Sequence, residues 1–255
     1  MRSILIGLFF LLVLWIIINE VHSMKNKDYI DLVAFWNNSF KINEEDKKAF
    51  ANINPNEDYK RLAPSQKQYD ALLTITNKEN ILDYGCGTGW ASIIMAKNGA
   101  KKITAVDVAS NSIEVVDAYA KAFNVEDNIK GIVIDENWLS NQKEETFDGF
   151  FSSNVIDVVP LEMAKDIIKN SAKVVKKGAR VIFSLNFYAV PEAMKARGAV
   201  VEGPHVYING VLRLTSLKDE EWLSIFKEFY QVEEVIYYAW PNEPKESRRL
   251  FILKK

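Results

Sequence analysis

The sequence predicts an α/β fold in which a mostly parallel sheet carries helices on both faces. Short apolar runs with the character of buried strands alternate with amphipathic segments from residue 81 onward. The first run, 81–84, leads directly into glycines at positions 85, 87 and 89, a strand-to-helix turn in which a ligand can lie against bare main chain. The chain has 255 residues, 48% of them apolar, which suffices for one sizeable core without disulfides or metals.

Seven strands are expected in this sheet. After the first strand, parallel strands are predicted at 103–108, 131–134, 147–152 and 179–185. Between the last two, Pro160 is expected to open a helix that ends at Lys176, Lys177 and Gly178, because cations and a glycine suit a helix C-terminus. Two final strands, 232–239 and 249–253, complete the sheet with an antiparallel ending.

Two further segments belong to this organisation. Residues 25–78 predict a helical cap, because apolar side chains recur at helical spacing after Asp28 and a second helix opens at Pro64. Residues 79–255 form the main domain and contain an inserted hairpin at about 205–214. The hairpin is predicted from Asn209-Gly210, a strong signal for a two-residue turn.

Residues 1–24 differ from the rest of the chain in hydropathy. Ile4 to Ile18 is an unbroken apolar run of 15 residues, about 22 Å long as a helix and shorter than the roughly 20 residues of a comfortable membrane span. Three interpretations stay open: an apolar helix that anchors the chain to the membrane, a cleaved signal peptide, or an extension upstream of a true start at Met24. The anchor is favoured, with residues 4–18 as the membrane contact and the main domain in the cytoplasm.

The composition argues against several functional classes. The formal net charge is −2, so no excess of positive charge favours binding to nucleic acid. Cys86 is the single cysteine, which excludes a disulfide within the chain. His22 and His205 are the two histidines, and neither lies near a cluster of metal ligands or a Ser-His-Asp pattern. No metal site is therefore expected.

The glycine loop indicates the kind of cofactor. A dinucleotide fingerprint would place a third glycine where Trp90 stands, and that glycine is needed for close packing of helix on strand. The pattern Asp83-Tyr84-Gly85-Cys86-Gly87-Thr88-Gly89 instead resembles the first motif of class I S-adenosylmethionine-dependent methyltransferases. The resemblance implies a Rossmann-like fold and a cofactor loop whose contributing residues are Asp83, Gly85, Cys86, Gly87 and Gly89.

Five further residues, at the ends of three strands, extend this cofactor site. Asp107 ends the second strand 18 residues after Gly89, where an acid that binds the ribose hydroxyls is expected. Ser110 and Asn111 are candidates to cap the next helix, so the Asp107 carboxylate is predicted to be free for the ligand. The resemblance adds Val108, Asp135 for the adenine amino group, Glu136 for the adenine ring, and Ser152 at the end of the fourth strand.

Lys176-Lys177-Gly178-Ala179 looks like another turn of the same family, so the resemblance covers roughly residues 60–186. It implies a methyltransferase that transfers a methyl group from S-adenosylmethionine, with the catalytic residues unknown. A small-molecule acceptor is favoured because the chain has no excess of positive charge for nucleic acid. Asp157 and His205 are weak candidates for a general base. Tyr59 and Arg61 are candidates to meet the amino-acid end of the cofactor.

Two alternatives use the same residues differently. An aminopropyltransferase shares the fold, although it would need further acids for a polyamine, and the region after the fourth strand offers only Asp157. A membrane-tethered protein that binds the cofactor or a partner without catalysis would explain the apolar N-terminus. The acceptor and the oligomeric state cannot be derived from the sequence.

Overall fold

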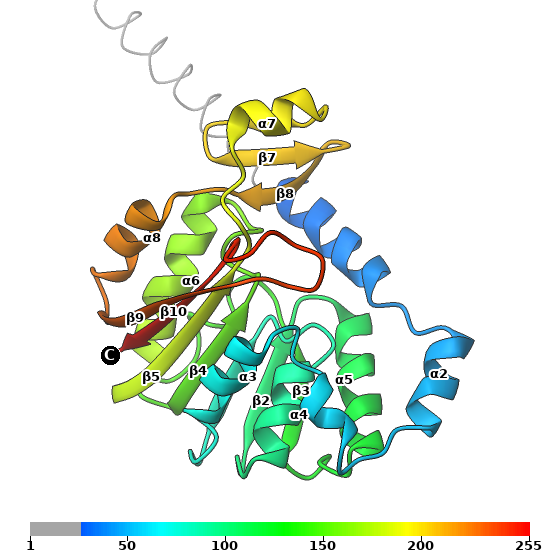
Figure 1. Ribbon diagram of the computed structural model, residues 1–255. Helices are drawn as coiled ribbons and strands as arrows, with labels where there is room; N and C mark the ends of the chain where they lie inside the picture. Colours follow the sequence, from blue (N-terminus) through cyan, green and yellow to red (C-terminus); the bar gives the residue numbers. More distant parts are fainter. Residues whose placement is uncertain (1–26) are drawn as a thin grey trace, which may run out of the picture.

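The computed structural model describes residues 27–255, and a seven-stranded sheet forms its centre (Figure 1). The strand order is β3-β2-β1-β4-β5-β10-β9. Strand β10 is antiparallel to both of its neighbours and all other pairs are parallel, which confirms the predicted sheet. The strands are β1 (Ile81–Tyr84), β2 (Ile103–Asp107), β3 (Ile129–Val133), β4 (Phe147–Ser153), β5 (Val175–Leu185), β9 (Gln231–Tyr238) and β10 (Arg248–Lys254).

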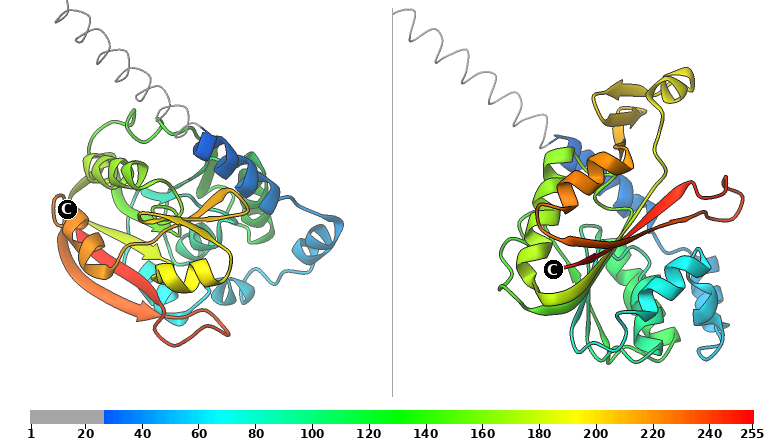
Figure 2. Two further views of the ribbon diagram at one scale, coloured as in Figure 1. Left: turned by 90° about the horizontal axis from the view of Figure 1, so that it is seen from above. Right: turned by 60° about the vertical axis from the view of Figure 1, so that its left-hand side comes forward.

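Helices cover both faces of the sheet, as predicted (Figures 1 and 2). One face carries α3 (Gln66–Leu73), α4 (Trp90–Lys97) and α5 (Ser110–Ala122), and the other carries α6 (Leu161–Val174) and α8 (Asp219–Phe226). Successive side chains of a strand point to opposite faces, so each strand supplies both cores. In β1, Ile81 packs with the α4 and α5 side, whereas Leu82 packs with the α6 side.

Helical segments precede the sheet. A helix occupies residues 27–39 and is followed by α2 (Glu44–Ala51) and the 3₁₀ turn η1 (Asp58–Arg61). Helix α2 has no buried residue, so no helical spacing of apolar residues in the sequence predicts it. It is held by a capping box, in which the Asn43 side chain accepts from the Asp46 N–H and the Asp46 carboxylate accepts from the Asn43 N–H.

The start of α5 corrects one prediction. Ala109 is the N-cap residue, and neither Ser110 nor Asn111 caps the helix with its own side chain. Asn37 from the N-terminal helix does this instead: its Oδ1 accepts from the Asn111 N–H at 3.0 Å and from the Ser110 hydroxyl at 3.1 Å. A distant segment therefore satisfies the first turn of α5, which ties the helical cap to the main domain.

The end of α6 corrects a second prediction. The helix ends at Val174, and the predicted C-terminal cap of Lys176, Lys177 and Gly178 lies in β5. Strand pairing competes with the helix for these backbone groups, because Val175 pairs with Phe147 and the Val174 carbonyl accepts from the Thr146 N–H at 2.7 Å. Pro160 is the N-cap residue, one position before the helix begins.

The predicted hairpin is confirmed and belongs to a small second sheet. Strands β7 (His205–Ile208) and β8 (Val211–Thr215) are joined by Asn209 and Gly210, whose φ angles of 54° and 76° suit a type I′ turn. Strand β6 (Val200–Glu202) and helix α7 (Pro191–Ala196) complete this unit. It stands beyond the carboxyl ends of the main strands in both figures.

The predicted membrane anchor falls on residues 1–24, which lie outside the described residues. It stays a prediction, as does the cytoplasmic location of the main domain. Within residues 27–255 no helix combines the length and the apolar character needed to cross a bilayer.

Replacing Asn37 with Ala should destabilise the folded chain by about 1–2 kcal/mol, because the first turn of α5 loses its capping oxygen. Chemical denaturation of the purified variants measures this loss. Asn38→Ala is a matched control, since Asn38 is an exposed neighbour of the same residue type. Equal losses in both variants would contradict the capping role.

Candidate cofactor and acceptor site

A cleft of about 680 Å³ lies at the carboxyl ends of the central strands. The glycine loop after β1 forms one wall, and Ser153 and Asn154 at the end of β4 form another. The helix at 27–39 contributes Tyr29 and Trp36. Since the carboxyl ends of parallel strands meet at one edge, this is where α/β sheets bind ligands.

The glycines of the loop have separate tasks. Gly85 adopts φ +69°, and a Cβ there would lie 2.2 Å from Val155 Cγ2, so no side chain fits. Gly87 faces the cleft beneath Phe40, whose ring lies 3.4 Å from the position of a Cβ. Gly89 is the left-handed N-cap of α4 and does not line the cleft. The loop thus presents bare main chain to a ligand at Gly85 and Gly87.

Asp83 lies below the loop and lines the cleft. Its Oδ2 accepts from the Ser92 hydroxyl at 2.6 Å. Burial raises the pKa of Asp83 to about 7, and the negative charge of Asp107 contributes to this rise. The hydrogen bond from Ser92 favours the carboxylate and acts in the opposite direction.

Asp107 is not free, contrary to the sequence-based expectation. Its Oδ2 accepts from the Gly87 N–H and its Oδ1 from the Ala109 N–H, each at 2.9 Å. Burial raises the pKa of this carboxyl, and the two backbone hydrogen bonds oppose that rise. A carboxylate has about four lone-pair positions. The Asp107 side chain, which also lines the cleft, can therefore hold the loop and still accept from a ligand.

The structure brings most of the predicted cofactor residues together. Seven of them line the cleft: Asp83, Gly85, Cys86, Gly87, Asp107, Val108 and Glu136. Asp135 is exposed outside the lining, and its Oδ1 accepts from the Asn137 N–H at 3.0 Å. Ser152 is buried behind the wall, and its hydroxyl has no partner among the described residues.

The two base candidates lie outside the cleft lining and have structural contacts. Asp157 is buried, accepts from the Asn186 N–H through Oδ2, and has its pKa raised by burial. His205 Nε2 accepts from the Leu161 N–H at 3.1 Å, which satisfies a donor at the start of α6. Tyr59 and Arg61, in η1, also lie outside the lining.

Several lining residues were missed by sequence reasoning. On α6, Glu162, Asp166 and Asn170 recur every four residues and line the cleft, a periodicity that could have marked a polar helix face. Trp240 also lines the cleft, but no local pattern identifies it. It lies near the start of the loop that joins β9 to β10.

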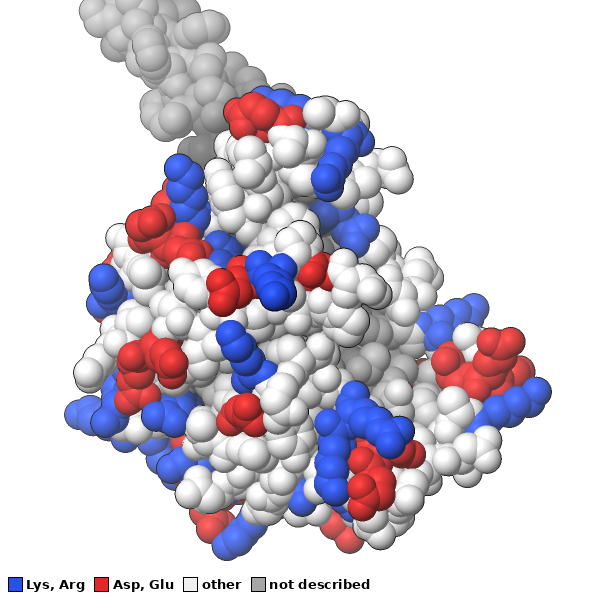
Figure 3. Space-filling model, viewed as in Figure 1, with Lys and Arg blue, Asp and Glu red and all other residues white. Residues whose placement is uncertain are grey.

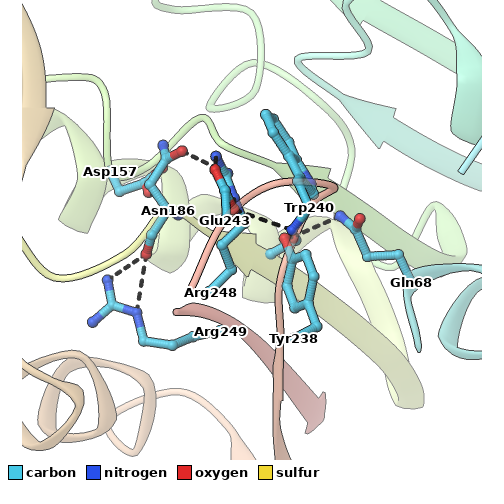
Figure 4. A network of polar contacts seen from close by, with 9 residues as sticks. Gln68, Asp157, Asn186, Tyr238, Trp240, Glu243, Arg248 and Arg249 are labelled. Carbon is cyan, nitrogen blue, oxygen red and sulfur yellow. Dashed lines mark hydrogen bonds and ion pairs between the residues drawn. The ribbon is translucent and has the colours of Figure 1, made fainter. Parts of the chain in front are cut away.

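Buried polar contacts hold that loop in place (Figure 4). The Arg248 guanidinium lies 3.3 Å from the Trp240 ring centroid and donates to both oxygens of Glu243, at 2.6 and 2.7 Å. It also donates to Asn186 Oδ1 at 2.8 Å. Trp240 is thereby fixed in the wall of the cleft.

The sequence and fold of this chain match known proteins. A family model described as a methyltransferase domain matches residues 81–178, a segment that begins with β1 and includes the glycine loop and Asp107. This match confirms, over residues 81–178, the resemblance to class I S-adenosylmethionine-dependent methyltransferases. Members of this family use S-adenosylmethionine as methyl donor.

Curated methyltransferases match part of the chain. The ubiquinone biosynthesis O-methyltransferase of Idiomarina loihiensis is 33% identical over 106 residues, which is 42% of each chain. The ribosomal protein L11 methyltransferase of Thermotoga maritima is 32% identical over 87 residues, 34% of this chain and 31% of that protein. The matches therefore span less than half of either relative.

Solved methyltransferase-like structures share the fold over a larger part. A protein of Pyrococcus horikoshii OT3 superposes with a TM-score of 0.59 at 19% identity, covering 78% of this chain and 98% of that one. A putative S-adenosylmethionine-dependent methyltransferase from Listeria monocytogenes gives 0.57 at 16% identity, covering 74% and 97%. At these identities the likeness shows the fold alone.

Acidification should weaken the fold through His205. Burial lowers the pKa of His205, so the folded state prefers neutral imidazole and its contribution is lost as the pH falls below the unfolded value of about 6.5. The Gln side chain of His205→Gln can still accept a hydrogen bond but does not titrate. Between pH 7.5 and 5.5 we therefore expect the melting temperature of this variant to fall less than that of the wild type. Equal losses in the two proteins would refute this role.

Asp107→Ala should lower the free energy of unfolding by about 1–3 kcal/mol without ligand, because the Gly87 and Ala109 N–H groups lose their acceptors. The free energy of unfolding of Asp107→Asn should lie between those of the wild type and Asp107→Ala, since an amide presents only one oxygen. The exposed Asp127 provides a control, for which the Ala variant should stay within about 0.5 kcal/mol. An unchanged Asp107→Ala protein would show that the loop does not depend on this carboxylate.

Proposed function

We propose that this chain catalyses methyl transfer from S-adenosylmethionine to a small-molecule acceptor. The observation that carries the proposal is the bare main chain of Gly85 and Gly87 beside the Asp107 carboxylate in one cleft. The glycine loop and, after it, Asp107 follow one another along the chain in the order expected from the resemblance to the family. S-adenosylmethionine supplies a methyl group already activated by a sulfonium leaving group.

The residues of the cleft fit this cofactor. Gly85 and Gly87 leave room for its methionyl part, and Asp107 has lone pairs left for the two ribose hydroxyls. Val108 and Glu136 lie at the wall after the next strands, where the adenine is expected. The family resemblance supports each assignment.

Positioning is the main catalytic contribution of the protein. The helix at 27–39 covers the cleft with Tyr29 and Trp36, which excludes water and restricts the orientation of the acceptor. Alignment of two bound reactants can supply effective molarities of about 10⁵–10⁸ M. Asp157 and His205 are engaged in hydrogen bonds outside the cleft lining, so we assign neither as a base.

The charge of the surface favours a small molecule over nucleic acid as acceptor. Lysine and arginine are interspersed with acids over the face shown in Figure 3, and the net charge is −2. Such a surface provides little affinity for phosphate backbones. The two curated relatives are named for ubiquinone biosynthesis and for ribosomal protein L11, so their names alone do not define one acceptor class.

Isothermal titration of the purified full-length chain should detect binding of S-adenosylmethionine and S-adenosylhomocysteine but not of NAD, because Trp90 occupies the position of the third dinucleotide glycine. Asp107→Asn should weaken both complexes at least about tenfold through the loss of charge-assisted bonds. Asp127→Asn is the matched control. Tight binding of NAD without response to either sulfur ligand would overturn the proposal.

A further inference from the structure

The cleft wall is acidic and contains no cation among the described residues. Its lining includes no Lys, Arg or His, and five carboxylates: Asp83, Asp107, Glu136, Glu162 and Asp166. The first two already have partners: Asp83 accepts from the Ser92 hydroxyl, and Asp107 accepts from the Gly87 and Ala109 N–H groups. The others add negative charge to a site that must also admit the acceptor, so an anionic acceptor would be repelled without compensation.

Helix stability accounts for Glu162, an acid in the first turn of α6, but not for Asp166. Glu162 and Asp166 lie four residues apart on one helix face, where like charges destabilise a helix. Glu162 forms an exposed ion pair with Lys165 at 2.9 Å, whereas Asp166 has no ion pair among the described residues. The Asp166 carboxylate is available to a ligand in the cleft.

Asn154 is an independent observation that points to a hydrogen-bond donor on the ligand. It lines the cleft directly after β4, and its Oδ1 is buried without a partner. Its backbone adopts φ +55°, a left-handed conformation, and is held there by an N–H to Ser184 carbonyl bond of 2.8 Å. Asn readily adopts this conformation, so the unpaired acceptor is the feature that points to a ligand, because most buried polar groups are hydrogen-bonded.

Aromatic side chains complete the wall. Tyr29, Trp36, Trp90 and Trp240 line the same cleft, and aromatic faces attract cations. The environment thus combines carboxylates, aromatic rings and the unpaired Asn154 oxygen, each of which suits a positively charged group that carries N–H donors. The Trp240 N–H also has no partner among the described residues and is available to an acceptor atom of the ligand.

We propose that the methyl acceptor is an amine and that Asn154 Oδ1 accepts a hydrogen bond from its nitrogen. The proposal rests on the methyltransferase function proposed above. The carboxylates attract the protonated amine, which must release one proton to water or to a carboxylate before it reacts. The neutral nitrogen donates its lone pair to the methyl carbon while the carbon–sulfur bonding pair stays on sulfur. The positive charge passes to nitrogen, which then loses a second proton.

Binding of simple probes tests the acceptor class without any turnover. Titrations of the full-length chain saturated with S-adenosylhomocysteine should show 2-phenylethylamine binding at least about tenfold more tightly than 2-phenylethanol or 3-phenylpropionate. These probes share a phenylethyl group and differ in the terminal group and its charge. Equal affinities, a reversed order, or no binding of the amine would overturn the proposal.

Variants at position 154 test the role of the amide oxygen. Asn154→Gly tolerates the positive φ and removes the oxygen, so it should weaken amine binding at least about fivefold with S-adenosylhomocysteine affinity unchanged. Asn154→Asp keeps an acceptor and should restore binding. Asn124→Gly is the control, because Asn124 is exposed and has the same φ of 55°. A Gly variant that keeps full preference for the amine would refute the assignment.

Transfer of labelled methyl groups separates the two proposals. With labelled S-adenosylmethionine and a cell metabolite extract, label should enter the fraction retained by a cation exchanger, in N-methyl products. Label in O-methyl or S-methyl products would overturn the amine proposal and leave the methyltransferase proposal standing. No transfer by a chain that binds the cofactor would contradict the methyltransferase proposal, and the probe titrations would still decide whether the cleft prefers amines.

Discussion

The Asp107 carboxylate joins the glycine loop to the end of β2, and the geometry of the cleft depends on this link. It accepts from the Gly87 and Ala109 N–H groups, while the Gly85 and Cys86 N–H groups share the Val106 carbonyl. These bonds can form only because β1 and β2 are parallel neighbours whose carboxyl ends meet. One buried acid therefore shapes the loop and stands at the wall that a ligand would contact.

The N-terminal helix at 27–39 completes a part of the core that the sheet alone leaves open. Residues 134–146 between β3 and β4 contain turns and no helix. Leu32 from the N-terminal helix is buried in the same cluster as Ile134 and Leu139, so it covers apolar surface at this place. Asn37 fixes the helix by hydrogen bonds to the first turn of α5. Packing and capping thus place one segment over the cleft.

Polar groups near the cleft divide into those with partners and those without. Asp157, His205 and Arg248 are held by hydrogen bonds that organise the ends of β5, α6 and β10. Asp157 Oδ1 and Asn154 Oδ1 are both buried without a partner among the described residues, but of the two residues only Asn154 lines the cleft. Groups engaged in structure are poorly placed to move protons, whereas an unpaired group can orient a ligand. This difference underlies both the assignment of positioning as the main catalytic contribution and the proposed amine acceptor.

Local rules determined the parallel strands, the glycine loop, the position of Asp107 and the Asn209-Gly210 turn, because each depends on residues that are near in sequence. The same rules failed where a partner lies far along the chain. Asn37 caps α5 in place of Ser110, and pairing with β4 draws Val175 out of the predicted helix. The place of Trp240 in the cleft and the unpaired state of Asn154 were decided only by the tertiary structure, since both depend on which distant groups the fold brings near them.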